Sequence, residues 1–150
     1  MKIVFCTLHV RRSPQAISLA AGCLAAALPP ALQAESVLIE AFPEETDGEI
    51  LSAIMSADPA VVAFPVYVWN RKRVLQLASE LNKRAPQIFL VAGGPEATGD
   101  PTGLLSSAPW SALVHGEGEA AFAGLIKALT EGLTQQGSEE HTSELQSRGL

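Results

Sequence analysis

Short apolar segments alternate along the chain with longer segments in which apolar residues recur at helical spacing. The short segments are rich in valine, isoleucine and leucine. Continuous apolar runs of this length are typical of strands that are buried on both faces of a parallel sheet. The pattern predicts strands at 2–7, 36–40, 60–65, 88–92 and 112–115.

Helix start and stop signals lie between these strands. Ser13 and Pro14 form an N-cap followed by proline at the first helical position, and the proline pair at 29–30 would end that helix. Thr46 and Glu49 have the spacing of a capping box. The predicted helices are 13–28, 46–57, a third that begins at Asn70 and ends before Pro86, 102–107 and 118–133.

Five strand–helix units in sequence predict an α/β fold with a doubly wound, five-stranded parallel sheet, because right-handed crossovers place helices on both faces. We expect the flavodoxin-like strand order 2-1-3-4-5, whose switch point lies between the first and third strands. Four loops then share one edge of the sheet. These loops are 8–12, 66–70, 93–100 and 116–119.

Two glycine-rich turns stand at this edge. GGPE (93–96) follows the fourth predicted strand, and GEGE (116–119) follows the fifth. Ligands of open parallel sheets bind at the carboxyl ends of the strands, and glycine lets a bulky ligand lie against bare backbone. Two such turns favour one long ligand that crosses several loops.

Composition narrows the class of protein. A chain of 150 residues, 47% of them hydrophobic, is long enough for one domain with a sizeable core. Its net charge of −6 argues against nucleic acid or an anionic membrane surface as a partner, and no apolar segment reaches membrane-spanning length. Cys6 and Cys23 fall within predicted core elements and form no metal-binding pattern, so we expect a reducing, cytoplasmic setting.

Several common ligand loops are absent from the expected positions. The turn after the first strand, 7–12, contains no glycine, which excludes a dinucleotide fingerprint, and no Gly-Lys-Ser or Gly-Lys-Thr occurs to form a P-loop. A phospho-receiver domain would need an acidic pair after the first strand and an aspartate where Pro65 ends the third. The segment 11–13 is a poor substitute for the Ser/Thr-rich phosphate loop of a flavodoxin.

Three motifs occur in order at the ends of the third, fourth and fifth predicted strands: VAFPVYVWN (62–70), GGPE (93–96) and GEGE (116–119). Together they resemble the N-terminal cobalamin-binding domain of radical S-adenosylmethionine (radical SAM) proteins. The resemblance covers about 1–129 and is closest to the DUF4080 subgroup, which shares the opening Thr-Leu and the Tyr-x-Trp-Asn pattern.

The resemblance implies that the domain holds cobalamin at the carboxyl edge of the sheet, with the nucleotide tail beside the glycine turns. In that family a following barrel carries a [4Fe–4S] cluster on a C-x-x-x-C-x-x-C motif and binds S-adenosylmethionine. No such motif occurs here, so we expect the cluster, S-adenosylmethionine and catalysis to reside in a radical SAM domain that is missing from this chain. The residues implied at the cofactor are Thr7, Leu8, His9, Val66, Tyr67, Trp69, Asn70, Gly93, Gly94, Pro95, Glu96, Gly116, Glu117 and Gly118.

The chain also departs from the family pattern. Classical cobalamin modules carry D-x-H-x-x-G after the first strand, and here His9 is present without the aspartate or the glycine. His9 is the candidate cobalt ligand, but it lacks the carboxylate partner that orients a ligating imidazole, so we expect no metal ligand from this chain. Pro65 stands where relatives typically carry a serine whose hydroxyl could bond the nucleotide. His115 either contacts ligand or forms local hydrogen bonds.

The glycines also have a purely structural interpretation. Gly93 and Gly94 could simply make a tight turn. Gly116 and Gly118 could only shape the entry to the last helix, where neighbouring glutamates are favourable at the N-terminus.

The loop after the third strand has two interpretations as well. Trp69 could cap the core while Asn70 serves as a helix N-cap, or the aromatic loop could cover the face of a planar macrocycle. The basic cluster 71–73 is either a solvated helix start or a contact for a phosphate or for the missing domain.

The end of the chain differs in character. The apolar period ends at Gly137, and 138–147 resemble a translated sequencing-library adapter. We therefore expect a domain at 1–133 and a disordered, artefactual tail at 134–150. The predicted function is a cobalamin-binding module of a radical SAM enzyme, without catalytic residues of its own. The alternatives are a degenerate module that binds no cobalamin and serves as an interaction surface, and a stand-alone flavin or nucleotide enzyme, against which the missing phosphate loop counts.

Overall fold

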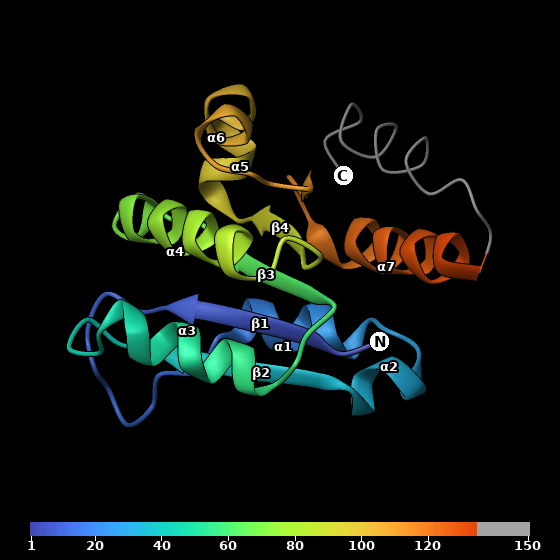
Figure 1. The fold of residues 1–150 in the computed structure, drawn as a ribbon, viewed down its shortest axis with the longest axis horizontal. Helices are drawn as coiled ribbons and strands as arrows, with labels where there is room; N and C mark the ends of the chain where they lie inside the picture. Colours follow the sequence, from blue (N-terminus) through green and yellow to red (C-terminus); the bar gives the residue numbers. More distant parts are fainter. Residues whose placement is uncertain (135–150) are drawn as a thin grey trace.

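Five parallel strands form one sheet in the order β2-β1-β3-β4-β5, as predicted, in the computed structural model, which describes residues 1–134 (Figure 1). β1 pairs with both β2 and β3, so the switch point lies between β1 and β3. The strands are β1 (Ile3–Leu8), β2 (Ser36–Ala41), β3 (Val61–Pro65), β4 (Phe89–Gly93) and β5 (Ala112–Leu113). The helices are α1 (Leu19–Ala26), α2 (Pro30–Ala34), α3 (Asp47–Ser56), α4 (Arg71–Arg84), α5 (Pro95–Gly99), α6 (Pro101–Ser107) and α7 (Gly118–Thr134).

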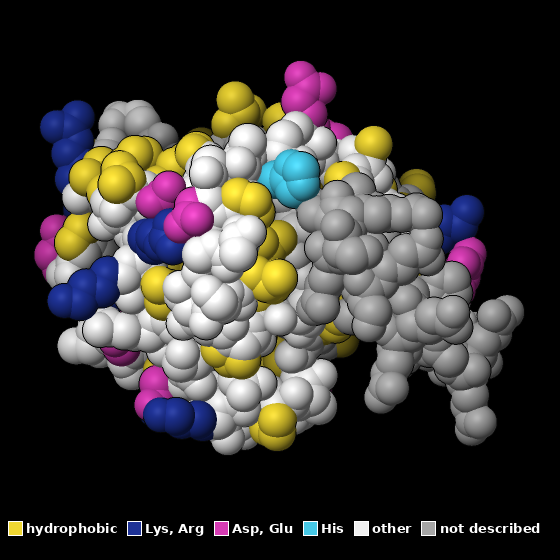
Figure 2. Space-filling model, turned by 90° about the horizontal axis from the view of Figure 1, so that it is seen from above, with side chains coloured by type: hydrophobic (Ala, Val, Ile, Leu, Met, Phe, Trp, Pro, Cys, Tyr) yellow, Lys and Arg dark blue, Asp and Glu magenta, His cyan; other side chains and the backbone are white. Residues whose placement is uncertain are grey.

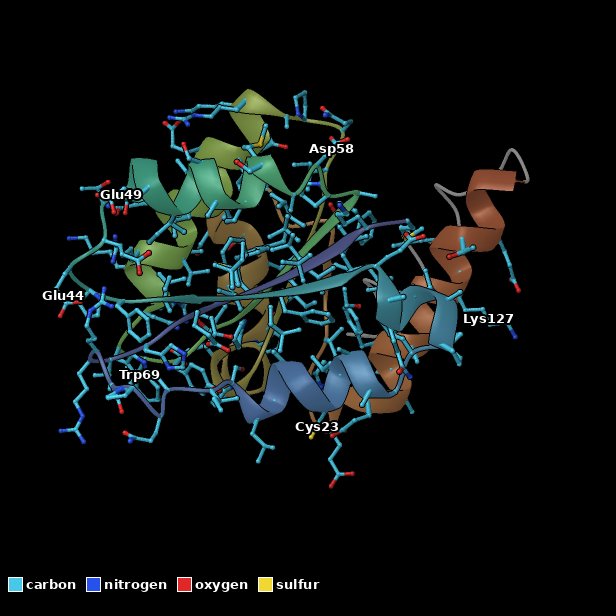
Figure 3. All side chains as sticks on the ribbon, turned by 90° about the horizontal axis from the view of Figure 1, so that it is seen from below. Cys23, Glu44, Glu49, Asp58, Trp69 and Lys127 are labelled. Atoms are coloured by element: carbon cyan, nitrogen blue, oxygen red, sulfur yellow. The ribbon has the colours of Figure 1, made fainter. Side chains whose placement is uncertain are left out.

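Helices cover both faces of the sheet, which lies between α1 and α3 in Figure 3. Successive side chains of a strand point to opposite faces, and β3 illustrates the result. Val62 and Phe64 belong to the core beneath α3 and α4, whereas Val61 and Ala63 belong to the core beneath α1 and α7. Burial on both faces explains why the strands appear in the sequence as continuous apolar runs.

The carboxyl ends of the strands lie at the left of Figures 1 and 3, where β1 points and where Trp69 is labelled. The loops that follow β1, β3, β4 and β5 meet at this edge. This is the arrangement that the strand order predicts for a ligand site.

The predicted start of the first helix at Ser13 is wrong. α1 begins at Leu19, and its N-cap is Ser18, whose Oγ accepts a hydrogen bond from the Ala21 N–H at 3.2 Å. The Ser18 N–H itself donates to Glu40 Oε1 on β2 at 3.0 Å. Either serine could cap a helix, and the tertiary contact with Glu40 decides between them. The segment before Ser18 is therefore a loop that runs along the carboxyl edge.

Other boundaries follow the sequence more closely. Thr46 caps α3 as predicted, with its Oγ1 accepting from the Glu49 N–H at 3.1 Å. The prolines at 29–30 follow the end of α1, and Pro30 also opens the short helix α2, which the sequence did not indicate. β5 is shorter than predicted, and His115 lies exposed beyond it. Cys23, expected in the core, is exposed on α1 and points away from the sheet in Figure 3.

α7 confirms the predicted last helix and extends to Thr134. The predicted artefactual tail, including the adapter-like segment 138–147, lies outside the described residues from 135 onward. None of the helices in the described part of the chain is long and apolar enough to cross a membrane.

Candidate functional site

A cavity of about 150 Å³ lies on the α1/α7 face of the sheet, at its carboxyl edge. Both glycine turns line it, through Gly93 and Gly94 after β4 and through Gly116 and Gly118 after β5. Phe5 of β1 and Phe122 of α7 form part of its buried wall, with their ring centroids 5.3 Å apart. The two turns that stood out in the sequence therefore belong to one cavity.

Gly94 is required by the backbone around it. Its φ is +87°, and a Cβ there would lie 3.0 Å from both the N and the O of Val66. The Val66 N–H donates to the Gly93 carbonyl at 2.8 Å, and the Val66 carbonyl accepts from the Glu96 N–H at 3.1 Å. Only glycine combines this backbone conformation with so close an approach. The tight-turn interpretation thus holds, and the turn also leaves bare backbone on the cavity wall.

The second turn serves the close approach of α1 and α7. A Cβ at Gly118 would lie 3.2 Å from Leu24 Cδ2 of α1 and 3.5 Å from Val114 Cγ1. Gly116 has a φ of +75°, and its N–H donates to Thr98 Oγ1 at 2.9 Å. A larger side chain at Gly118 would therefore displace α1 or enter the cavity.

A shallower hollow of about 290 Å³ adjoins the cavity and shares Ala20 and Tyr67 with it. The loops after β1 and β3 line this hollow, through Thr7, Leu8 and His9 on one side and Tyr67 and Trp69 on the other. The large apolar side chains exposed on these two loops and at the start of α1 are Val10, Ile17, Leu19, Val68 and Trp69.

The rings of Tyr67 and Trp69 stack, with centroids 4.5 Å apart and planes 5° from parallel. Trp69 is 55% exposed, so the interpretation in which it caps the core is wrong. The stack presents a flat aromatic surface at the edge of the sheet.

Thr7 is the polar group of the hollow that lacks a partner. The residue is only 5% exposed, and its Oγ1 has no hydrogen-bond partner within residues 1–134. Buried hydroxyls are nearly always hydrogen-bonded. An orphaned hydroxyl in the lining of a hollow is suited to a polar group of a bound ligand.

Asn70 holds the two lining loops together. Its Oδ1 accepts from the Tyr67 N–H at 2.8 Å, and its Nδ2 donates to the carbonyls of Leu8 and Pro65 at 3.1 and 3.3 Å. Asn70 occupies the N-cap position of α4, as predicted, but its side chain makes no capping hydrogen bond to that helix. Because Asn70 is 4% exposed and its amide is occupied by backbone partners, it positions the site.

His9 has a carboxylate partner, contrary to our expectation. Its Nε2 forms a short contact with Glu40 Oε2, and its ring stacks on Phe42 with centroids 5.5 Å apart. The partner comes from the adjacent strand, since the register places Thr7 of β1 opposite Glu40 of β2. The D-x-H pattern could not reveal Glu40, because the pattern considers only a carboxylate two residues before the histidine. The contact occupies Nε2 and leaves Nδ1 as the other ring nitrogen.

Two of the three basic residues at the start of α4 form ion pairs. Arg71 pairs with Glu96 at 3.6 Å and with Asp100 at 3.0 Å, and Arg73 pairs with Asp47 at 2.8 Å. Figure 2 shows acidic and basic side chains next to one another on the face that carries α5 and α6. These pairs favour a structural role for the two arginines, and they link α4 to its neighbours.

Most of the candidate residues from the sequence line the cavity or the hollow, and the others line neither. Tyr67, Gly93, Gly94, Gly116 and Gly118 line the cavity, and Thr7, Leu8, His9, Tyr67 and Trp69 line the hollow. The candidates that line neither are Val66, Asn70, Pro95, Glu96 and Glu117.

Sequence reasoning missed the contribution of α1 to the cavity. Ala20, Ala21 and Leu24 line it. The run of small residues at 20–22 is a signal of close packing, but the wrong helix start at Ser13 obscured its position at the edge. Within residues 1–134, no group of three or more His, Cys, Asp or Glu side chains is placed to hold a metal ion.

Comparison with known proteins gives the family. The sequence model of the family described as the B12 binding domain matches residues 9–126, which is most of the chain. The chain therefore belongs to the B12-binding domain family, and its fold is that of cobalamin-binding domains.

Among characterised relatives, the chain is 40% identical over 81 residues to 2-(S-pantetheinyl)-carbapenam-3-carboxylate methyltransferase of Streptantibioticus cattleyicolor, covering 53% of this chain and 12% of that protein. It is 39% identical over 70 residues to the cobalamin-dependent radical SAM methyltransferase TokK of Streptomyces tokunonensis, covering 46% of this chain and 10% of TokK. The chain thus spans about a tenth of the length of these relatives.

Among solved structures, the cobalamin-dependent S-adenosylmethionine radical enzyme OxsB with aqua-cobalamin bound superposes with a TM-score of 0.65 at 15% identity. The match covers 87% of this chain and 19% of OxsB. At this identity the likeness establishes the fold.

Proposed function

We propose that this domain binds cobalamin, with the nucleotide tail in the cavity between α1 and α7 and the corrin ring over the adjoining hollow. The observation that carries the proposal is that the two spaces are adjacent: they share Ala20 and Tyr67 and together span the loops after β1, β3, β4 and β5. A deep apolar cavity beside an open edge suits a ligand with an aromatic tail and a broad, planar head.

The residues present fit such a ligand. The glycine turns leave bare backbone beside the tail, and a Cβ at Gly118 would crowd that wall. The exposed face of the Tyr67–Trp69 stack suits contact with a planar macrocycle. The unpartnered hydroxyl of Thr7 is available to an amide side chain of the corrin. We propose no cobalt ligand from this chain. Glu40 holds the Nε2 of His9, so Nδ1 is the ring nitrogen at which a His9 variant would test this proposal.

Bound cobalamin would supply methyl-transfer or radical chemistry. The residues of this chain bind and orient it, and we assign none of them as an acid, base or nucleophile. We propose that the reaction belongs to a radical SAM domain with a [4Fe–4S] cluster and S-adenosylmethionine, in a cytoplasmic enzyme of the DUF4080-like type. The much greater length of TokK and of the carbapenam methyltransferase supports a multidomain parent.

The test mixes the purified chain with hydroxocobalamin and passes it through a desalting column. We expect corrin absorbance to elute with the protein in near-stoichiometric amount. The same chain unfolded in urea, as a control, should retain none.

The alternative function is a degenerate module that binds its catalytic domain without cobalamin. Pro65, which offers no hydroxyl or N–H to a nucleotide, and the exposed apolar side chains of Ile17, Leu19 and Val68 favour it. If the folded chain retains no corrin absorbance, the cobalamin-binding hypothesis is refuted and the degenerate module is favoured.

A further inference from the structure

The cavity between α1 and α7 has an apolar buried wall. Among the described residues that line it, only Tyr67 and Glu119 carry polar side chains, and Glu119 is exposed while Tyr67 is half-buried. The buried part of the wall comes from aromatic and aliphatic residues: Phe5, Ala21, Ala63, Phe64, Val91, Val114 and Phe122.

Four backbone groups of the wall have hydrogen-bond partners within the domain. The Gly93 carbonyl accepts from the Val66 N–H at 2.8 Å, and the Gly94 carbonyl accepts from the Thr98 N–H at 3.2 Å. The Val114 N–H donates to the Ala92 carbonyl at 2.8 Å, and the Gly116 N–H donates to Thr98 Oγ1. These four groups are therefore already engaged when a ligand enters the cavity.

The size of the cavity suits one planar ring system. Its volume of about 150 Å³ equals that of an engineered apolar cavity, about 150 Å³, that stays dry and binds benzene. Burial of an apolar ring there is favourable, whereas a ring with several nitrogens and an amine would lose its water partners without replacement.

We propose that this cavity selects among cobamides, the corrinoids that differ in the base of the nucleotide tail, by the polarity of that base. It binds an apolar benzimidazole in preference to a purine. The selectivity rests on the cobalamin-binding function proposed above, and it concerns the same cavity.

The test measures equilibrium dissociation constants for the full chain by dialysis, with corrin absorbance as the readout. The probes are hydroxocobalamin, whose base is dimethylbenzimidazole, the corresponding cobamide with adenine, and cobinamide, which has no nucleotide tail. All are measured in excess cyanide, which displaces the base from cobalt, so that no cobalt–base bond has to break when the tail enters the cavity. We expect hydroxocobalamin to bind at least about tenfold more tightly than the adenine cobamide, a difference of about 1.4 kcal/mol, and more tightly than cobinamide.

The outcomes separate the two proposals. Equal affinity for the two complete cobamides would overturn the selectivity while leaving cobalamin binding intact. Cobinamide binding as tightly as hydroxocobalamin would overturn the cavity as the tail site. Failure of all three probes to bind would overturn the proposed function itself, and the selectivity with it.

A matched pair of variants ties the selectivity to the wall. Val91→Thr places a hydroxyl in the cavity at nearly constant shape, and Val62→Thr makes the same change in the core on the opposite face of the sheet. We expect Val91→Thr to reduce the preference at least about threefold and Val62→Thr to leave it unchanged.

If Val91→Thr does not fold, Pro65→Ser replaces it as the test of wall polarity, because it adds a hydroxyl at the half-buried end of β3, which also lines the cavity. It too should reduce the preference. An unchanged preference in a folded variant of the cavity wall would refute the role of wall polarity.

Discussion

Asn70 connects the two chain segments that line the hollow, at the ends of β1 and β3, so its replacement is the sharpest test of the structure. The side chain makes one hydrogen bond to the Tyr67 N–H and two to the carbonyls of Leu8 and Pro65. Asn70→Ala removes all three and leaves the Leu8 carbonyl and the Tyr67 N–H without these partners.

The magnitude follows from the number of bonds. Each intramolecular hydrogen bond contributes about 0.5–1.5 kcal/mol net, and a buried group left unpaired costs about 1–3 kcal/mol. We expect Asn70→Ala to lower the free energy of unfolding by about 2–4 kcal/mol. A domain of this size has about 5–15 kcal/mol in total, so the variant should still fold. Asn70→Asp should be at least as destabilising, because a carboxylate would face two carbonyl oxygens.

The assay is urea unfolding followed by circular dichroism and by tryptophan fluorescence, since Trp69 lies on the loop that Asn70 holds. Asn82→Ala on α4 is the matched control, and its change should stay within about 0.5 kcal/mol. A loss below about 1 kcal/mol for Asn70→Ala, with Asn82→Ala as expected, would refute the clamp role. Cobalamin retention by Asn70→Ala should also fall, because the loops that line the hollow would lose their connection.

Three further predictions concern the cavity, the histidine and the thiols. Gly118→Leu should abolish cobalamin retention while the chain stays folded, because the side chain would meet Leu24 and fill the mouth of the cavity. His9→Ala should leave the absorption spectrum of bound cobalamin unchanged. Burial, with a smaller contribution from nearby glutamates, raises the pKa of the Cys6 thiol to about 12, so a thiol reagent at pH 8 should label only exposed Cys23 until the chain is denatured.

Each of these has a control or a contrary outcome. Gly124→Leu, on the outer side of the same helix where a Cβ meets open space, should retain cobalamin. A clear spectral change in His9→Ala would establish histidine ligation of cobalt. Two fast-reacting thiols in the native chain would contradict the burial of Cys6. Because the pKa of Cys6 is higher in the folded chain than in the unfolded chain, its contribution favours unfolding as the pH rises above about 8.5.

The sequence determined the architecture because strand burial and helix capping are local signals. The continuous apolar run of β3 and the Thr46–Glu49 capping box predicted their elements correctly. The alternation of strands and helices then predicted the order of the sheet, because right-handed crossovers leave few alternatives. The glycine turns indicated the edge of the sheet where the cavity lies, and the backbone at Gly94 accepts only glycine.

Tertiary structure alone decided the details of the site, because they depend on residues far apart in the sequence. The register of β1 and β2 places Glu40 beside His9. Glu40 also accepts a hydrogen bond from the Ser18 N–H, which selects Ser18 over Ser13 as the N-cap of α1. Asn70 occupies the N-cap position of α4, yet its side-chain amide binds the backbone of Leu8 and Pro65 at the ends of β1 and β3 and of Tyr67 on the loop after β3. The cavity itself exists only where α1 and α7 approach each other at Gly118, a contact that no local pattern encodes.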